Sequence, residues 1–148
     1  MPYSIHVINQ KEEVVLAYYF KGNKGSLDDI FEEKLRVESR FYWRKVSSPL
    51  SIVVSSRCIL MHDCGIDCTI LLSGDEDEDE LGLQSSLTVL EKILSAVCEL
   101  DTSRLESRQI LTFHGKVVVC LNEAYPLGVR RLTNADAVVK AAKLKAFT

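Results

Sequence analysis

The stretch from Asp75 to Asp101 constrains the fold of this chain more than any other part of the sequence. It opens with a run of carboxylates, Asp75–Glu80, and continues into a segment whose apolar residues recur at alternating steps of four and three. Those apolar residues are Leu83, Leu87, Leu90, Leu94 and Val97, with Ile93 and Cys98 beside them. This spacing lines one face of an α-helix, and carboxylates are favourable where a helix presents its unpaired N–H groups. The stretch therefore predicts a long core helix with an acidic N-terminal cap.

Two stretches of the sequence contain several residues of the types that bind metal ions. The acidic run lacks both the glycine and the closing glutamate of a twelve-residue calcium loop. Cys58, His62, Cys64 and Cys68 lie close together in the sequence, but zinc ligands are usually paired as Cys-x2-Cys. These residues fall on two expected strands and their turn, so we interpret them as buried thiols and a turn histidine. We therefore predict no metal site and no cofactor.

A catalytic site was considered at Cys120, which has His114 and Asn122 near it in the sequence. Such residue types catalyse acyl transfer when their side chains converge. Cys120 follows three valines, however, and burial in such a run raises the pKa of a thiol and makes it inert. The sequence also has no Gly-rich phosphate loop, serine elbow or pair of catalytic carboxylates. We predict no catalytic residues, and an enzyme that uses Cys120 is the weakest alternative.

Composition indicates a single domain over residues 1–148. The formal net charge of −3 disfavours a general nucleic-acid binder, because phosphate binding needs a basic surface. We expect no membrane-spanning segment, since no apolar run approaches about eighteen residues, and the first four residues lack the plan of a secretion signal. The five cysteines are odd in number, as is typical of a reducing compartment. We expect a cytoplasmic protein with at most peripheral membrane contact.

Shorter patterns predict the remaining elements. Alternating or continuous apolar runs predict strands at residues 3–9, 14–20, 50–54, 57–61 and 66–72. Helical spacing begins at Leu27, after the capping residue Ser26, and continues into the segment 40–43. The run 116–121 is too short to distinguish a strand from a buried helix, whereas residues 133–146 predict a helix. This order predicts an α+β fold, with a five-stranded antiparallel sheet flanked by helices.

Two stretches resemble the small (sigma) subunits of clathrin adaptor complexes. Residues 96–101 resemble the Val-Cys-Glu-Leu-Asp end of the central helix in those subunits. Residues 116–128, followed by Arg131 and Thr133, resemble their Lys-Val…Asp-Glu…Gly…Glu-Thr segment. The resemblance implies a longin-like fold for the whole chain. The long segment between Asp101 and Lys116 is similar to that of the coatomer zeta subunit, and the chain also resembles the longin-like small subunit of the plant TPLATE (TSET) complex.

The chain departs from sigma subunits where those subunits read a dileucine sorting signal. The resemblance implies that the positions of the apolar pocket are Cys64, Leu87, Val97 and Thr102. The basic position beside the pocket falls on Val15, and Asn122 stands where the family usually has aspartate. Without a cation, the acidic residue of the signal loses its charge-assisted contact. The resemblance thus implies a degenerate pocket in a chain that keeps the fold without reading cargo.

A segment rich in arginine and aromatic residues is our preferred partner surface, because these residue types often dominate interfaces. Its members are Arg36, Arg40, Phe41, Tyr42, Trp43 and Arg44. The structural alternative is a solvated helix face. A second basic patch, formed by Arg130, Arg131, Lys140, Lys143 and Lys145, is open to the same two interpretations.

The resemblance implies a non-enzymatic subunit that packs against a large adaptin-like subunit and, with a medium subunit, scaffolds a vesicle coat. Such a coat acts in clathrin-mediated endocytosis, so we expect peripheral association with the plasma membrane or with vesicle coats. Contact with clathrin and membrane would come through the assembly. Two alternatives are a conventional adaptor sigma or coatomer zeta subunit, and a longin-domain regulator or tether of small GTPases.

Overall fold

The computed structural model describes residues 2–20, 25, 27–43, 48–76, 78–99 and 104–125. The expected Ser26 cap, the expected helix over residues 133–146 and the second basic patch lie outside these residues. Within them, every expected strand and both expected helices are present.

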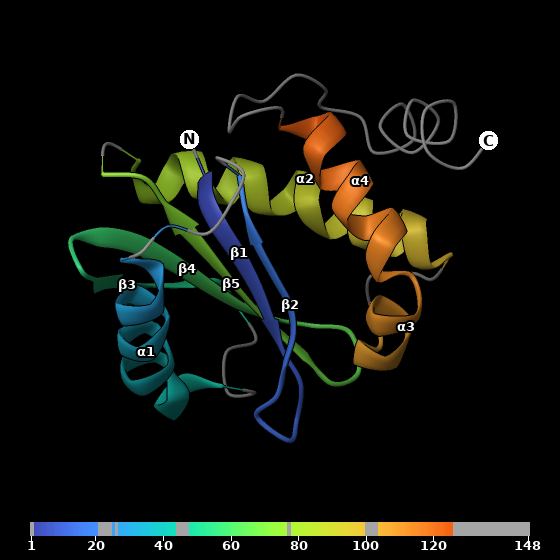
Figure 1. The fold of residues 1–148 in the computed structure, drawn as a ribbon, viewed down its shortest axis with the longest axis horizontal. Helices are drawn as coiled ribbons and strands as arrows, with labels where there is room; N and C mark the ends of the chain where they lie inside the picture. The colour runs from blue at the N-terminus through green and yellow to red at the C-terminus, as the bar shows by residue number, and fades with distance from the viewer. Residues whose placement is uncertain are drawn as a thin grey trace.

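Five antiparallel strands form one sheet in the order β2-β1-β5-β4-β3 (Figure 1). The strands are β1 (Pro2–Ile8), β2 (Val14–Tyr19), β3 (Leu50–Val54), β4 (Arg57–Cys64) and β5 (Cys68–Gly74). The prediction of a turn that includes His62 and Cys64 is wrong, because β4 continues through both residues. His62 pairs with Ile70 of β5, and Cys64 pairs with Cys68. The turn is confined to residues 65–67, where Gly65 has a φ of +70°.

Helices cover both faces of the sheet (Figure 1). The helix α1 (Asp28–Ser39), continued by a 3-10 turn at Arg40–Tyr42, lies on one face. The helices α2 (Glu80–Cys98), α3 (Ser107–Thr112) and α4 (His114–Ala124) lie on the other. Side chains alternate between the faces of a strand, so Leu60 of β4 belongs to the core under α2 while Ile59 and Met61 belong to the core under α1.

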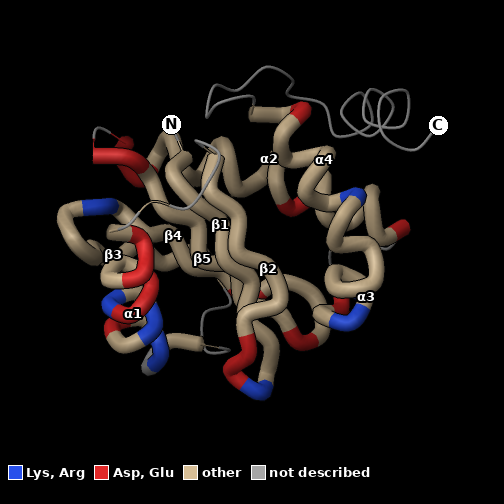
Figure 2. The backbone as a smooth tube through the Cα atoms, viewed as in Figure 1, with Lys and Arg blue, Asp and Glu red and all other residues tan. Residues whose placement is uncertain are grey.

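The long helix α2 follows the predicted pattern. Leu83, Leu90, Ile93 and Leu94 have no exposed surface. At the acidic end, Asp79 is the N-cap and its Oδ1 accepts a hydrogen bond from the Gly82 N–H at 2.8 Å, which confirms the predicted cap. Figure 2 shows the acidic residues gathered just before α2. By length and composition alone α2 could also cross a membrane, but its apolar face is buried against the sheet.

The apolar run whose period left strand and helix open forms part of α4. Its buried residues, Val117, Cys120, Leu121 and Ala124, follow the i, i+3, i+4, i+7 spacing of one helical face. That face belongs to the same core as α2. We call this shared core, which also includes Leu60 and Leu90, the α2 core.

The sheet face under α1 is more polar. Tyr3 and His6 of β1 both reach α1: the Tyr3 hydroxyl donates to Asp28, and His6 Nε2 lies 3.1 Å from Glu32 Oε1. In a regular strand, residues an odd number apart point to opposite faces. The pairing of β1 with β5 shifts between Pro2 and Ser4, and this β-bulge brings both side chains to the α1 face.

The central place of α2 predicts a strong response to truncation of its buried face. Replacing Leu90, which has no exposed surface, by alanine should lower the free energy of unfolding by about 2–5 kcal/mol, because a cavity is left in the core. Urea unfolding of the purified chain measures this. Leu81→Ala is the matched control: Leu81 lies on the same helix but is 76% exposed, so its change should stay within about 0.5 kcal/mol. Equal losses for the two variants would contradict the packing.

Candidate functional site

The four residues considered as zinc ligands do not gather as a metal centre. Cys64 and Cys68 are buried and Cys58 is half-buried. His62 Nδ1 instead lies 2.5 Å from Glu91 Oε1 on α2. Among the residues that the structure describes, no group of three or more histidine, cysteine or carboxylate side chains could hold a metal ion.

The three residues considered for nucleophilic catalysis are not brought together. Cys120 has no exposed surface and packs in the α2 core. His114 and Asn122 are exposed on the same helix. A buried thiol cannot meet a substrate, so this geometry gives Cys120 a packing role.

Four of the five positions implied for a dileucine pocket share the α2 core. They are Val15, Cys64, Leu87 and Val97, all at most 6% exposed, whereas Thr102 lies outside the described residues. Leu105, which has no exposed surface, belongs to the same core. In the described part of the chain these positions are therefore packed interior.

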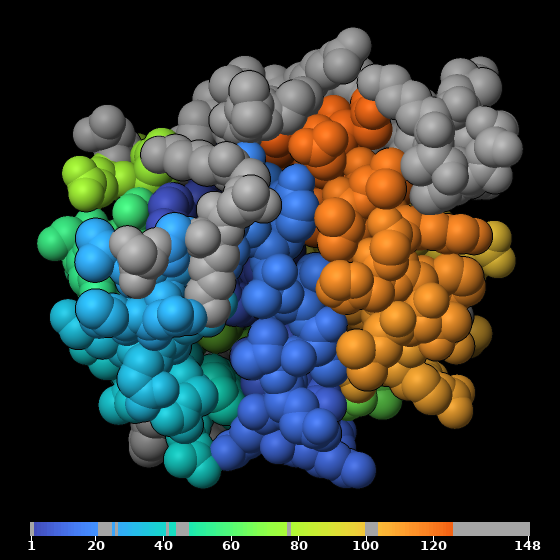
Figure 3. Space-filling model, in the orientation of Figure 1, coloured from blue at the N-terminus to red at the C-terminus, as the bar shows by residue number. Residues whose placement is uncertain are grey.

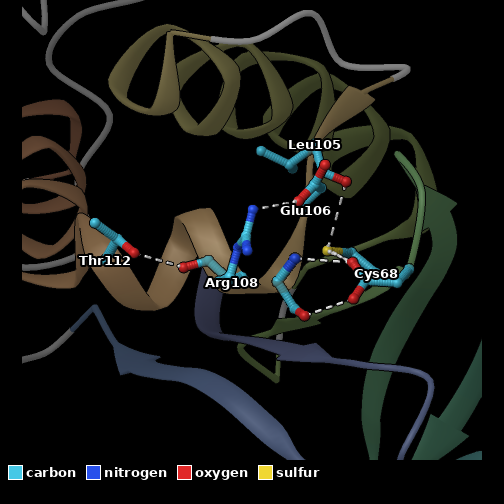
Figure 4. Close-up of polar contacts among 7 residues, drawn as sticks. Cys68, Leu105, Glu106, Arg108 and Thr112 are labelled. Atoms are coloured by element: carbon cyan, nitrogen blue, oxygen red, sulfur yellow. Dashed lines mark hydrogen bonds and ion pairs between the residues drawn. The ribbon is translucent and has the colours of Figure 1, made fainter.

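The segment around Leu105 is fastened to the turn between β4 and β5 (Figure 4). The Asp67 carboxylate accepts hydrogen bonds from the Ser107 N–H at 2.8 Å and from the Ser107 hydroxyl at 2.6 Å. The Ile66 N–H donates to the Leu105 carbonyl at 2.9 Å. A Cβ at Gly65 would lie 2.1 Å from that carbonyl oxygen, so this close approach requires glycine. We call these contacts the Asp67 staple.

The predicted arginine-rich surface lies on the flank of α1 that faces β2. Arg36 pairs with Glu33 at 2.8 Å, and Arg40 reaches Glu12, in the turn between β1 and β2, at 2.7 Å. Trp43 is only 8% exposed and packs in the core under α1, where its Nε1–H donates to the Ser39 hydroxyl at 2.9 Å. Tyr42 is partly exposed. The side chain of Phe41 and all of Arg44 lie outside the described residues.

A groove of about 620 Å³ opens on this same flank, between α1 and β2. Figure 3 shows the light-blue atoms of α1 beside the darker blue atoms of β2. Ile8, Leu35 and Leu71 are the most buried of its apolar residues, and Trp43 adds an aromatic surface. Asp29, Glu32, Glu33 and Arg36 contribute charged side chains to the α1 side of the groove. We call this feature the α1–β2 groove.

Glu32 organises the polar side of the groove. Its Oε1 accepts a hydrogen bond from the Tyr19 hydroxyl at 2.8 Å and lies 3.1 Å from His6 Nε2. Burial, reinforced by the hydrogen bond to Glu32, raises the pKa of Tyr19 far above its ordinary value, so the phenol stays a donor. Sequence analysis missed this site, because its residues come from three strands, a helix and Trp43. The only local signal is that His6 and Tyr19 are polar or aromatic residues within otherwise apolar strands.

A second surface missed from the sequence is an apolar stripe on the opposite flank of α1. Leu27, Ile30 and Val37 are 74%, 56% and 60% exposed, and their spacing places them on one side of the helix. We call these three residues the α1 stripe. Such a row of large apolar side chains is typical of a surface that another protein covers.

Comparisons with known proteins find similarity in structure but not in sequence. No protein-family model matches this chain, and no curated protein matches by sequence. Among solved structures, the chain is similar to a chain from a homology model of the full-length AP-3 complex in a stretched open conformation. The TM-score is 0.61 at 14% identity, over 97% of this chain and 92% of that chain. Together with the five-stranded sheet and its helices, this match confirms the predicted longin-like α+β fold.

Loss of the Asp67 staple should loosen the segment that it holds. Asp67→Ala removes the acceptors of two partly buried hydrogen bonds, so the free energy of unfolding should fall by about 1–3 kcal/mol. Hydrogen exchange at the amides of Ile66 and Ser107, which donate the backbone hydrogen bonds of the staple, should accelerate as well. Glu106→Ala is the control, because Glu106 makes only a 3.8 Å contact to an exposed arginine and should change stability by less than about 1 kcal/mol. Unchanged exchange in Asp67→Ala would contradict the staple.

The buried thiol of Cys98 predicts a loss of stability in alkali. Burial raises the pKa of Cys98 to about 11, whereas an unfolded thiol titrates near pH 8.5–9. Between about pH 9 and 11 the unfolded chain loses a proton that the folded chain keeps, so the free energy of unfolding falls as pH rises. Cys98→Ala should lack this part of the decline, about 2 kcal/mol. Urea unfolding from pH 8 to 10.5 compares the slopes, and identical slopes would refute the assignment.

Proposed function

We propose that this chain is a longin-fold small subunit of an adaptor-like vesicle coat complex. The observation that carries the proposal is the structural match to a chain of the AP-3 complex, which extends over 97% of one chain and 92% of the other. The match therefore extends over the whole sheet and the helices on both of its faces, and not over a local motif. A fold alone does not identify a function, because one fold supports many functions. The proposal therefore also relies on residues 96–101 and 116–128, which resemble sigma subunits in sequence.

Those two stretches meet in the folded chain. Residues 96–99 end α2, and residues 116–125 lie on α4 or directly follow it. Cys98 from the first stretch and Cys120 from the second belong to the same core. Because α2 and α4 pack against each other, residues on one helix constrain residues on the other. This gives a physical reason why both stretches resemble the same family.

The mechanism we propose is scaffolding by burial. The α1 stripe is apolar and exposed in the isolated chain, so a large adaptin-like subunit that covers it would gain about 1–2 kcal/mol for each fully buried side chain. The chain would then be a non-enzymatic part of a complex with large and medium subunits, cytoplasmic and peripheral to the membrane.

In finer detail, we assign the complex to the TPLATE (TSET) type, acting with clathrin in endocytosis at the plasma membrane. The support is the buried Val15 at the position where a sigma subunit that reads acidic dileucine signals carries a cation. The packed state of Cys64, Leu87 and Val97 agrees with a subunit that assembles coats without reading that signal.

Affinity purification of the tagged chain from its own cells, followed by mass spectrometry, tests this proposal. We expect stoichiometric recovery of a large adaptin-like chain and a medium subunit. Val37→Asp should reduce their recovery by about tenfold or more, because a charge is then buried in the interface. Leu111→Asp is the matched control, since Leu111 is 55% exposed on α3, away from α1.

The identities of the recovered chains separate the alternatives. Subunits of a conventional adaptor or of coatomer would replace the TPLATE-type assignment by a sigma or zeta one. Recovery of a small GTPase or of tethering factors alone would overturn the coat proposal. Equal losses for Val37→Asp and Leu111→Asp would refute the role of the α1 stripe.

A further inference from the structure

The two edges of the sheet are protected to different degrees. The pairing of β2 with β1 has a register shift, and α3 lies beside β2 (Figure 1). Bulges and covering elements are devices that keep an edge from pairing with another chain. The strand β3, at the opposite edge, pairs with β4 without a shift and contains no charged residue and no proline. We propose that β3 pairs with β3 of a second copy of this chain, an inference that does not rest on the coat proposal.

The turn that joins β3 to β4 determines which backbone groups of β3 bond within the sheet. Ser55 and Ser56 both have positive φ, 51° and 66°, as in the two-residue turns that match the twist of a hairpin. The turn brings Val54 directly opposite Arg57. A turn of this kind is closed by a hydrogen bond between its flanking residues, so Val54 directs its N–H and C=O groups toward β4.

The backbone groups that point away from β4 belong to Ser51 and Val53. Hydrogen-bonded and non-bonded positions alternate along an antiparallel pair, so the residues an odd number of steps from Val54 direct their N–H and C=O groups outward. No other described backbone group pairs with these two residues. The edge also has apolar side chains in contact with water, since Val53 is 70% and Leu50 38% exposed. The edge is therefore open to a further strand.

An antiparallel pair of β3 strands centred on Ile52 satisfies all of these outward groups. It places Ser51 of one copy opposite Val53 of the other, and residues in such positions exchange both of their hydrogen bonds. On the other face of the strand, Ile52 meets its own symmetry mate and Leu50 meets Val54. No charges oppose each other, and apolar β-branched side chains are favourable cross-strand neighbours. The strand is thus complementary to itself, which is why the proposed occupant is a second copy.

Two-fold symmetry also keeps the layers of the fold aligned. Ile52 and Val54 pack in the core under α1, and residues directly opposite in an antiparallel pair share one face. Both copies therefore place α1 on the same face of the joined sheet and α2 on the other. The strand β2 then lies at each end of the joined sheet. Because the contact uses the same strand of both copies, it closes at two and does not continue into a fibre.

Sedimentation equilibrium of the purified full chain tests the pairing. We expect a monomer–dimer equilibrium with a Kd of about 10–100 μM, because an edge contact is small, and no larger species. Hydrogen exchange locates the contact. The amides of Ser51 and Val53 should exchange more slowly as the chain concentration rises, whereas the Ile52 amide, which already bonds to β4, should change little.

Matched variants separate the edge from the rest of the surface. Ser51→Pro removes an outward N–H without removing a bond to β4, and proline is tolerated at such edge positions, so the dimer should weaken about tenfold or more. Val53→Lys places a charge on the edge and should have a similar effect. Val14→Lys is the control, since Val14 is 52% exposed on the opposite edge strand, and it should leave the dimer unchanged. Urea unfolding of the diluted chains shows that each variant folds.

Four outcomes would overturn the proposal. The first is a chain that stays monomeric at about 200 μM. The second is that Val14→Lys weakens the dimer as much as Val53→Lys does. The third is that the dimer persists in both β3 variants and is lost in Val37→Asp, which would make the α1 stripe the contact. The fourth is that the Ser51 and Val53 amides are protected only when a co-purified protein is added, which would make a strand of that protein the occupant.

Discussion

Burial of α2 against the five-stranded sheet is the interaction on which the rest of the molecule depends. The helix covers the strands with a face of leucines, isoleucine and valine that water cannot reach, and burial of such area is the dominant favourable term in folding. The helices α3 and α4 complete this core, and the Asp67 staple ties the segment that enters α3 to the end of the β4–β5 hairpin. This face of the sheet is thereby buried under the three helices.

The other side of the sheet is built differently. Under α1 the strands present Ser4, His6 and Ser73, each with a buried polar atom that has no partner among the described residues. The bulge in β1 turns Tyr3 and His6 toward α1, where carboxylates meet both. Burying a polar group without a hydrogen-bond partner costs free energy. The unpaired polar atoms of Ser4, His6 and Ser73 therefore do not stabilise the fold.

The two flanks of α1 differ in chemistry. The α1 stripe is apolar and suits the broad, hydrophobic contact of a permanent subunit interface. The α1–β2 groove is concave, acidic and lined by aromatic residues, which suits a narrower and more selective ligand.

The sequence by itself determined the strands, the long helix and the acidic cap at Asp79, because period and capping are local properties that neighbouring residues express. It did not determine whether the apolar run at Val117 is a strand or a helix, because so short a run fits both patterns. Packing against α2 in the folded chain is consistent only with the helix. It also placed His62 in a turn, since only the pairing of β4 with β5 shows where the strand ends. The arginine-rich segment was identified, yet Trp43 packs inward, because which side of a short turn faces the core depends on the sheet beneath. Only the tertiary structure decided the α1–β2 groove and the α1 stripe, since distant residues such as His6, Tyr19 and Glu32 acquire a common chemistry only when the fold brings them together.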